Sequence, residues 1–180
     1  ASYSPYIQWV VTVFMLLFSV NFSCYYLFLI GRFKDAFNSE LRRFICIVGA
    51  VILVITLNVR GLFDTLGDAV RHVAFTVASL ISTTGFATEN FDAWPELSRT
   101  LLVLVMFIGA CAGSTGGGMK VSRWVIWTKA SYSDMRRMLH PNAVSTVRFE
   151  GKTLPDRDVR SVHLYLTMYI CVFTLSMLVL

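Results

Sequence analysis

Long apolar blocks separated by short polar stretches run through the whole chain. Residues 6–30 and 162–180 are apolar over lengths typical of transmembrane helices, and residues 44–59 reach that length with their flanks. A further apolar stretch, 97–129, is interrupted by a glycine-rich segment at 110–118, where three consecutive glycines should break a helix. The pattern therefore predicts an all-α membrane protein in which one span is broken.

One apolar block is too short to cross a membrane. Residues 68–82 span about 22 Å as a helix, whereas the hydrocarbon core is about 30 Å thick. Asp68 lies near the start of this helix, where a negative charge suits the helix dipole. The block predicts a helix that enters the membrane and stops inside it, followed by a polar stretch at 83–88.

The basic residues support a re-entrant layout. Thirteen of the sixteen lysines and arginines fall in residues 32–43 and 120–160, whereas residues 60–99 carry three basic and five acidic side chains. The positive-inside rule assigns both basic stretches to the cytoplasm, which requires an even number of crossings between them. Spans 44–59 and 97–128 supply two crossings, so residues 68–88 are predicted to enter the membrane and return.

The composition narrows the function class. The chain is 56% hydrophobic with mean hydropathy +0.63, and its net charge of +5 is explained by membrane topology, so no nucleic-acid partner is predicted. The four cysteines lie in apolar stretches without metal-ligand spacing. Because no convergent nucleophile, base or metal cluster is apparent, we predict that the chain is not an enzyme and binds no cofactor.

The stretch after the short helix is a candidate ion filter. Small and hydroxyl residues with one glycine allow an extended backbone whose carbonyls face one side, and carbonyl rings replace the water shell of K⁺. The candidate filter comprises residues 83–88. Phe86 is also predicted to wedge the strand against neighbouring helices. The alternative is an ordinary glycine turn in a helical hairpin.

The glycine-rich break is the second candidate site, and its residues are Gly113, Ser114, Thr115, Gly116, Gly117 and Gly118. A broken helix frees backbone groups that can form an ion site or a gate. Close helix packing by small residues is an alternative. A phosphate-binding loop is disfavoured, because Met119 and Lys120 follow where that motif requires Lys-Ser/Thr. Lys120 and Arg123 either anchor the helix at the membrane surface or act at an inner pore mouth.

Together, Thr83-Thr84-Gly85-Phe86-Ala87 and the run from Gly113 to Arg123 resemble the membrane subunit of bacterial Trk-type potassium uptake systems, in the Trk/Ktr/HKT superfamily. The resemblance implies a potassium-channel-like fold of helix, re-entrant pore helix and helix, repeated four times in the parent chain. It implies that Gly85 is the filter glycine, with Thr83, Thr84 and Phe86 as neighbouring carbonyl donors. It also implies that K⁺ is the transported ion at the filter carbonyls. Residues 113–118 would form an intramembrane gating loop.

The resemblance also implies a division of the chain. Its parts would be the last helix of a preceding repeat (1–31), a cytoplasmic connector (32–43), a complete repeat (44–130), a cytoplasmic loop (131–161) and the start of the next repeat (162–180). Three of the four filter segments would lie in the rest of the parent chain. The implied partners are those remaining repeats, a second copy in a homodimer, a cytosolic nucleotide-binding regulatory ring and the lipid bilayer of the bacterial inner membrane.

Two transport functions follow from this reading, and a structural membrane subunit that conducts no ion is a third option. The first is potassium uptake through a channel-like pore. The alternative is a secondary cation transporter that works by alternating access, with its ion site at the broken helix.

Overall fold

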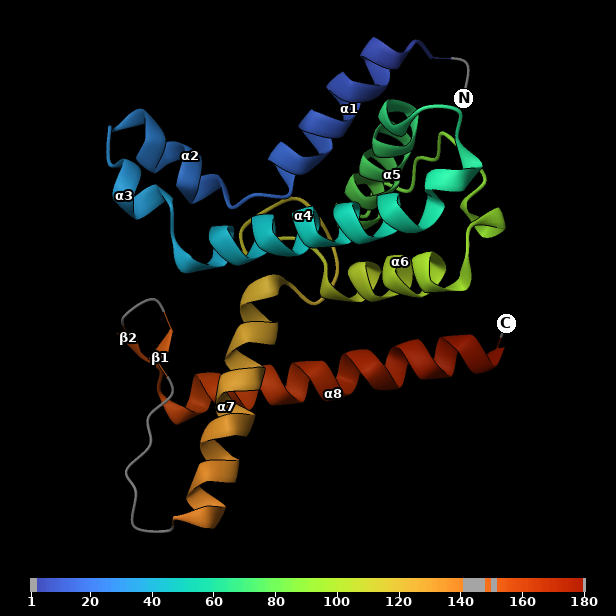
Figure 1. Ribbon diagram of the computed structural model, residues 1–180. Coiled ribbons are helices and arrows are strands. Elements are labelled where there is room, and N and C mark those ends of the chain that lie inside the picture. Colours follow the sequence, from blue (N-terminus) through green and yellow to red (C-terminus); the bar gives the residue numbers. More distant parts are fainter. Residues whose placement is uncertain (1–2, 141–147, 150–151, 180) are drawn as a thin grey trace. The chain divides into compact units, whose positions relative to one another are not determined.

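The computed structural model describes residues 3–140, 148–149 and 152–179, and most of them are helical (Figure 1). The chain forms two compact units, Ala1–Val121 and Ser122–Leu180. The first unit contains α1 (Pro5–Phe18), α2 (Phe22–Leu29), α3 (Phe33–Ala36), α4 (Ser39–Val59), η1 (Arg60–Leu62), α5 (Leu66–Ile81), η2 (Phe91–Ala93) and α6 (Glu96–Ile108). The helix α7 (Val121–Leu139) leads into the second unit, which continues with β1 (Arg148–Phe149), β2 (Lys152–Thr153) and α8 (Asp156–Val179).

Two helical stretches among the described residues are long and apolar enough to cross a membrane. They are Ser39–Leu62 and Asp156–Ser176, and they contain most of the predicted spans 44–59 and 162–180. The pair formed by α1 and α2 makes a third span if a bent pair is counted as one. The observed fold confirms the prediction of an all-α membrane protein.

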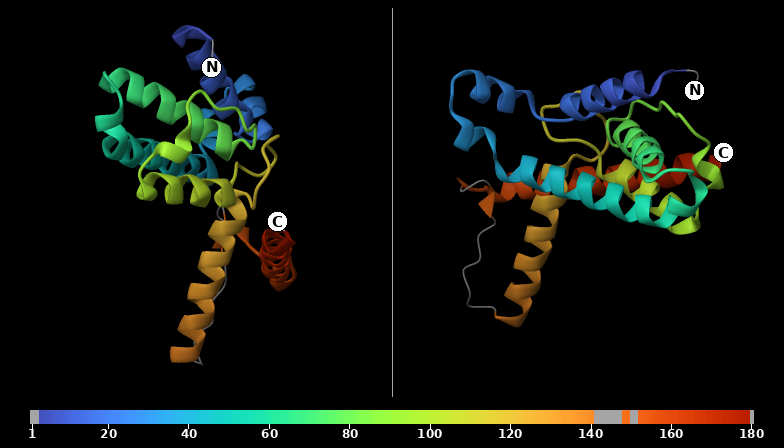
Figure 2. Two further views of the ribbon diagram at one scale, coloured as in Figure 1. Left: turned by 90° about the vertical axis from the view of Figure 1, so that its right-hand side faces the viewer. Right: turned by 45° about the horizontal axis from the view of Figure 1, so that its top comes forward.

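The short helix α5 is the centre of the first unit. It packs against α1, α4 and α6, which surround it in the views of Figure 2. Val73 and Val77 of α5, Ile55 of α4 and Val105 of α6 are completely or almost completely buried. Leu66–Ile81 closely matches the predicted helix at 68–82. Its surrounded position explains why a helix too short to span the membrane is nevertheless apolar on most faces.

The single helix predicted over residues 6–30 is instead two helices bent by 92°. Asn21 caps the start of α2 by accepting a hydrogen bond from the Ser23 N–H, at 2.8 Å. The backbone groups freed at the bend find partners in a distant segment, because the Ser19 carbonyl accepts from the Cys111 N–H at 3.0 Å. The amphipathic pattern did not reveal this break, since both helices are apolar.

The predicted connector at 32–43 also contains more structure than expected. Residues Phe33–Ala36 form α3, and α4 begins at Ser39. Asn38 caps α4 by accepting from the Leu41 N–H at 2.8 Å. The connector is therefore a tight turn, and the first turn of α4 is partly buried.

The second unit shows that the predicted polar loop at 131–161 is partly regular. The helix α7 continues to Leu139, and the strands β1 and β2 pair antiparallel with Arg148 opposite Thr153. Residues 141–147 and 150–151 of that stretch lie outside the described residues. The Arg123 guanidinium of α7 lies 3.9 Å from the centre of the Tyr165 ring of α8, a cation–π contact.

Candidate functional site

The chain turns back along α5 immediately after that helix ends. The Thr84 N–H donates to the Ser79 carbonyl at 2.9 Å, in the last turn of the helix. Thr88 Oγ1 lies 2.9 Å from His72 Nδ1, near the other end of α5. Residues 83–88, the return segment, therefore run antiparallel to the helix without regular secondary structure of their own. This helix-and-return hairpin is the arrangement that the short apolar block and the charges predicted.

The return segment has an unusual backbone at two positions. Gly85 has φ +79°, and Thr83 has φ +58°. A β-branched residue with positive φ is a genuine outlier that costs about 1–3 kcal/mol and persists only when its surroundings enforce it. Such strain is concentrated at functional sites, which makes Thr83 a candidate functional residue.

A polar network holds the far end of the return segment. Arg71 Nε donates to the side-chain oxygen of buried Gln8 at 3.0 Å, and Arg71 Nη2 lies 3.2 Å from His72 Nε2. Because arginine can only donate, His72 Nε2 accepts, and its Nδ1–H therefore donates to Thr88 Oγ1. Neutral His72 thus links α1 and α5 to the return segment.

The start of α5 completes this network. Thr65 caps the helix by accepting from the Asp68 N–H at 3.1 Å, and its hydroxyl donates to the Asp68 carboxylate at 2.6 Å. The Thr65 hydrogen bond and the nearby Arg71 guanidinium lower the pKa of Asp68. The stabilisation from an ionised Asp68 is therefore present above the ordinary carboxyl pKa and is lost as the pH falls through the lowered value.

The apolar span at 97–129 is interrupted as predicted. The helix α6 ends at Ile108, α7 begins at Val121, and residues 109–120, the glycine loop, lie between them. The loop folds tightly on itself: a Cβ atom on Gly109 would lie 2.6 Å from the Gly117 carbonyl oxygen. A Cβ atom on Gly118 would lie 2.7 Å from the Gly109 Cα. These glycines are therefore required for close backbone packing, and not only for freedom of movement.

The glycine loop contacts the start of the return segment directly. The Gly117 N–H donates to Thr83 Oγ1 at 2.8 Å, and the same hydroxyl donates to the Ser82 carbonyl at 2.7 Å. A Cβ atom on Gly116 would lie 3.4 Å from the Ser82 carbonyl oxygen. The structure thus brings the two predicted sites together at the strained residue Thr83.

The predicted inner-mouth basic residues lie in different surroundings. Lys120, with φ +71°, turns its ammonium group back onto the loop, where it donates to the Gly116 carbonyl and lies 3.4 Å from Ser114 Oγ. Arg123 contacts Tyr165 within the second unit. Lys120 is therefore a structural part of the glycine loop and does not simply extend to a membrane surface.

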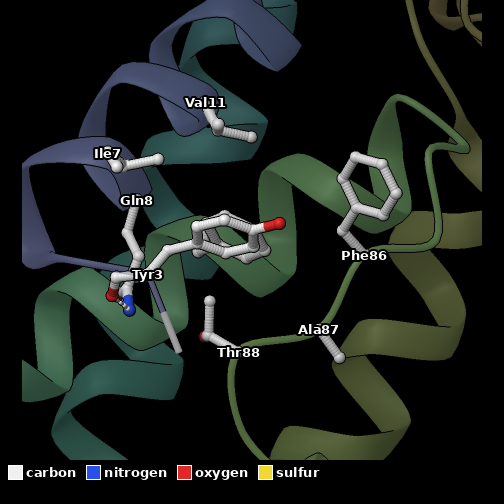
Figure 3. Close-up of a pocket in the computed structure, with 8 residues that line it drawn as sticks. Tyr3, Ile7, Gln8, Val11, Phe86, Ala87 and Thr88 are labelled. Carbon is white, nitrogen blue, oxygen red and sulfur yellow. Dashed lines mark hydrogen bonds between the residues drawn. The ribbon is translucent and has the colours of Figure 1, made fainter. Parts of the chain in front are cut away.

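An apolar hollow of about 400 Å³ lies beside the return segment. Figure 3 shows Phe86, Ala87 and Thr88 on one side of it and Tyr3, Ile7, Gln8 and Val11 on the other. The Phe86 side chain is 61% exposed, so in this chain it is not wedged between helices as predicted.

Within residues 3–140, 148–149 and 152–179, no group of three histidine, cysteine, aspartate or glutamate side chains is placed to hold a metal ion. The polar groups that residues 83–88 themselves offer are instead backbone carbonyls and threonine hydroxyls. Donors of this kind suit a weakly held alkali cation that passes through a site.

Comparison with known proteins identifies the family. The sequence matches the family TrkH, described as cation transport protein, over residues 1–180. The chain belongs to the TrkH family. A family with that description agrees with the predictions that the chain is not an enzyme and binds no cofactor. The TrkH family is a family of the bacterial inner membrane, and the long apolar helices α4 and α8 fit that location.

Several TrkH-family relatives match nearly the whole chain. The Trk system potassium uptake protein TrkH of Salmonella typhimurium is 32% identical over 97% of this chain and 37% of its own length. The Trk system potassium uptake protein TrkG of Escherichia coli (strain K12) is 34% identical over 87% of this chain and 33% of its own length. The chain therefore spans little more than a third of these relatives.

A solved structure supports the fold in the same way. The crystal structure of the potassium transporter TrkH from Vibrio parahaemolyticus matches with a TM-score of 0.88 and 35% identity. The match covers 97% of this chain and 39% of that chain. The helix-and-return hairpin and the broken helix thus belong to a fold shared with a TrkH-family potassium transporter.

Two residues that contact the glycine loop were not predicted from the sequence. Glu40 is almost completely buried, and its Oε1 accepts from the Ala112 N–H at 2.7 Å. Asn21 Oδ1 lies 2.9 Å from where a Cβ atom on Gly113 would be. The only sequence signals were an acidic residue two positions after the cap of an apolar helix and an asparagine inside an apolar block.

Proposed function

We propose that this chain contributes one filter segment and an intramembrane gate to a pore that takes up K⁺ in a TrkH-type system. The filter carbonyls come from Thr83, Thr84, Gly85 and Phe86, and the gate is the glycine loop. The observation that carries the proposal is the contact between the two sites: the Gly117 N–H donates to the strained Thr83 at 2.8 Å. A loop at that position can obstruct an ion leaving the filter.

The backbone of the return segment supports the filter role. Positive φ at Thr83 and Gly85, on either side of Thr84, favours neighbouring carbonyls that face a common side. The end of α5 presents the negative end of its helix dipole to the same place, which favours a cation. The outer network through His72 and Thr88 would keep the segment rigid while ions pass.

The position of Lys120 favours the channel-like reading over alternating access. Its ammonium group already donates a hydrogen bond to the Gly116 carbonyl oxygen. An ion-binding loop would place that carbonyl on a bound cation, and a fixed positive charge beside it would repel the cation. The same charge below the filter would help to close the pore.

Partners are part of the proposal. Because one chain of this length offers one filter segment, the remaining segments would come from the rest of the parent protein. Exposed apolar side chains, such as Phe86 at 61% and Leu57 at 63%, are available for contact with those repeats, a second copy or lipid. The second unit, with its basic residues, would face a cytosolic nucleotide-binding regulatory ring.

The transport mechanism can be tested by current recording from the full-length protein in a planar bilayer. We expect discrete, K⁺-selective single-channel openings, because a filter with a movable loop conducts whenever the loop is displaced. Saturable, coupled K⁺ flux in liposomes of the same preparation without any channel currents would contradict the channel-like reading and favour alternating access.

The topology can be tested with single cysteines in a full-length background lacking the native thiols. Exposed Asn90 and Ser131 are suitable positions. We expect an impermeant thiol reagent to label Asn90→Cys only from outside and Ser131→Cys only from the cytoplasm. Labelling of Asn90→Cys from the cytoplasm and of Ser131→Cys from outside would contradict the re-entrant hairpin, because it would mean that residues 68–88 cross the membrane.

A further inference from the structure

The glycine loop has two halves with different partners. In residues 111–115, the Cys111 N–H donates to the Ser19 carbonyl at 3.0 Å, and the Thr115 N–H donates to the Phe18 carbonyl at 3.3 Å. The Gly113 carbonyl accepts from the Phe22 N–H at 3.1 Å. These bonds attach the first half of the loop to the bend between α1 and α2, which lies beside the loop in Figure 1.

Glu40 reinforces the same half from another helix. Its carboxylate, in the first turn of α4, accepts from the Ala112 N–H at 2.7 Å and is 3% exposed. Hydrogen bonds to ionised groups are about twice as strong as neutral ones, and a helix start favours a negative charge. Burying an acidic side chain is costly unless it is hydrogen-bonded, and this bond accounts for the buried position of Glu40.

Asn21 packs closely against the first half of the loop. Its side-chain oxygen caps α2 and lies against Gly113, which has φ +68°. A Cβ atom on Gly113 would approach that oxygen to 2.9 Å, so only glycine fits there. We call the five residues Phe18, Ser19, Asn21, Phe22 and Glu40 the loop socket.

The second half of the loop is held differently. The Gly117 N–H donates to Thr83 in the return segment, and the Gly116 carbonyl accepts from Lys120 at the end of the loop. Displacing this half breaks those two bonds and the backbone packing of Gly117 and Gly118 on Gly109, which lies in the loop itself. Displacing residues 111–115 breaks bonds to three separate helices. Three successive glycines also give the second half the larger conformational range.

We infer that the loop socket fixes residues 111–115 when the pore opens, so that only residues 116–118 move, and that Glu40 is the positioning residue of this device. The inference rests on the gate role proposed above. It assigns the bend between α1 and α2 a purpose, since a straight helix would have no free carbonyls to offer the loop.

Native Cys111 is a reporter for this inference, because it lies in the fixed half and is 1% exposed. In full-length protein with the other native cysteines replaced, we expect Cys111 to resist a small thiol reagent. Deleting residues 116–118 should raise K⁺ flux and leave Cys111 protected. Flux that rises together with Cys111 labelling would overturn the inference while keeping the gate. Flux that does not rise would overturn the gate proposal itself.

Substitution of Glu40 tests the positioning role. Glu40→Ala removes the acceptor of the Ala112 N–H, and we expect Cys111 labelling and basal K⁺ flux each to rise about tenfold. Glu40→Gln keeps an acceptor oxygen and should stay within a few-fold of the parent, as should Arg42→Ala, an exposed neighbour on the same helix turn. Protection of Cys111 in a correctly inserted Glu40→Ala protein would contradict the role. If Glu40→Ala does not insert, Asn21→Ala gives the same readout.

Discussion

Deleting residues 116–118 from the full-length protein is expected to produce a pore that conducts K⁺ continuously. The deletion removes the Gly117 N–H that contacts Thr83 and the Gly116 carbonyl that holds Lys120. The obstruction below the filter is then gone, whereas the return segment keeps its anchors on α5. Isotope flux into liposomes should rise by at least about tenfold, since that factor corresponds to about 1.4 kcal/mol of free energy that no longer favours the closed pore. K⁺ over Na⁺ selectivity should change little.

A milder variant tests the same step without shortening the chain. Lys120→Met removes the ammonium group from the Gly116 carbonyl and keeps most of the side-chain length. Because a hydrogen bond from a charged group contributes about 1.5–3 kcal/mol, we expect flux to rise in the same direction. A well-inserted deletion protein without K⁺ transport would contradict the gate and would favour an ion site at the broken helix.

Gly85→Ser is expected to reduce K⁺ over Na⁺ discrimination strongly. Gly85 has φ +79°. Adopting a left-handed backbone conformation costs a residue with a side chain roughly 1–2 kcal/mol. A Cβ atom there meets nothing within 4 Å in this chain, so the expected damage comes from the backbone, which turns its carbonyl away from the ion. The permeability ratio from reversal potentials should fall by about tenfold.

Comparing three substitutions at Gly85 separates the effect of backbone conformation from the effect of side-chain size. Asparagine adopts positive φ more readily than most residues, so Gly85→Asn should preserve more selectivity than Gly85→Ser or Gly85→Val. If all three variants lose selectivity equally, a clash with another part of the parent pore is the cause. An unchanged permeability ratio in every variant would remove Gly85 from the filter.

The sequence alone predicted the features that depend on local composition. The length of the block at 68–82 predicted a helix too short to cross, and the observed α5 matches it closely. Three adjacent glycines predicted the break after α6, since glycine destabilises a helix interior. The distribution of lysine and arginine predicted that residues 68–88 turn back, which the contact between Thr88 and His72 confirms for the fold.

Only the tertiary structure decided how these parts meet. Glu40 and Ala112 are 72 positions apart, and Thr115 bonds to Phe18 across 97 positions. No local pattern encodes such contacts. From the sequence we therefore expected one apolar helix across residues 19–21, and we assigned Glu40 to the connector at 32–43. The bend and Glu40 both supply hydrogen-bond acceptors to backbone N–H groups of the glycine loop, which need partners inside an apolar environment. The sequence determined where the short helix ends and where the glycine break lies, and packing between distant segments determined the bend at residues 19–21 and what the glycine loop binds.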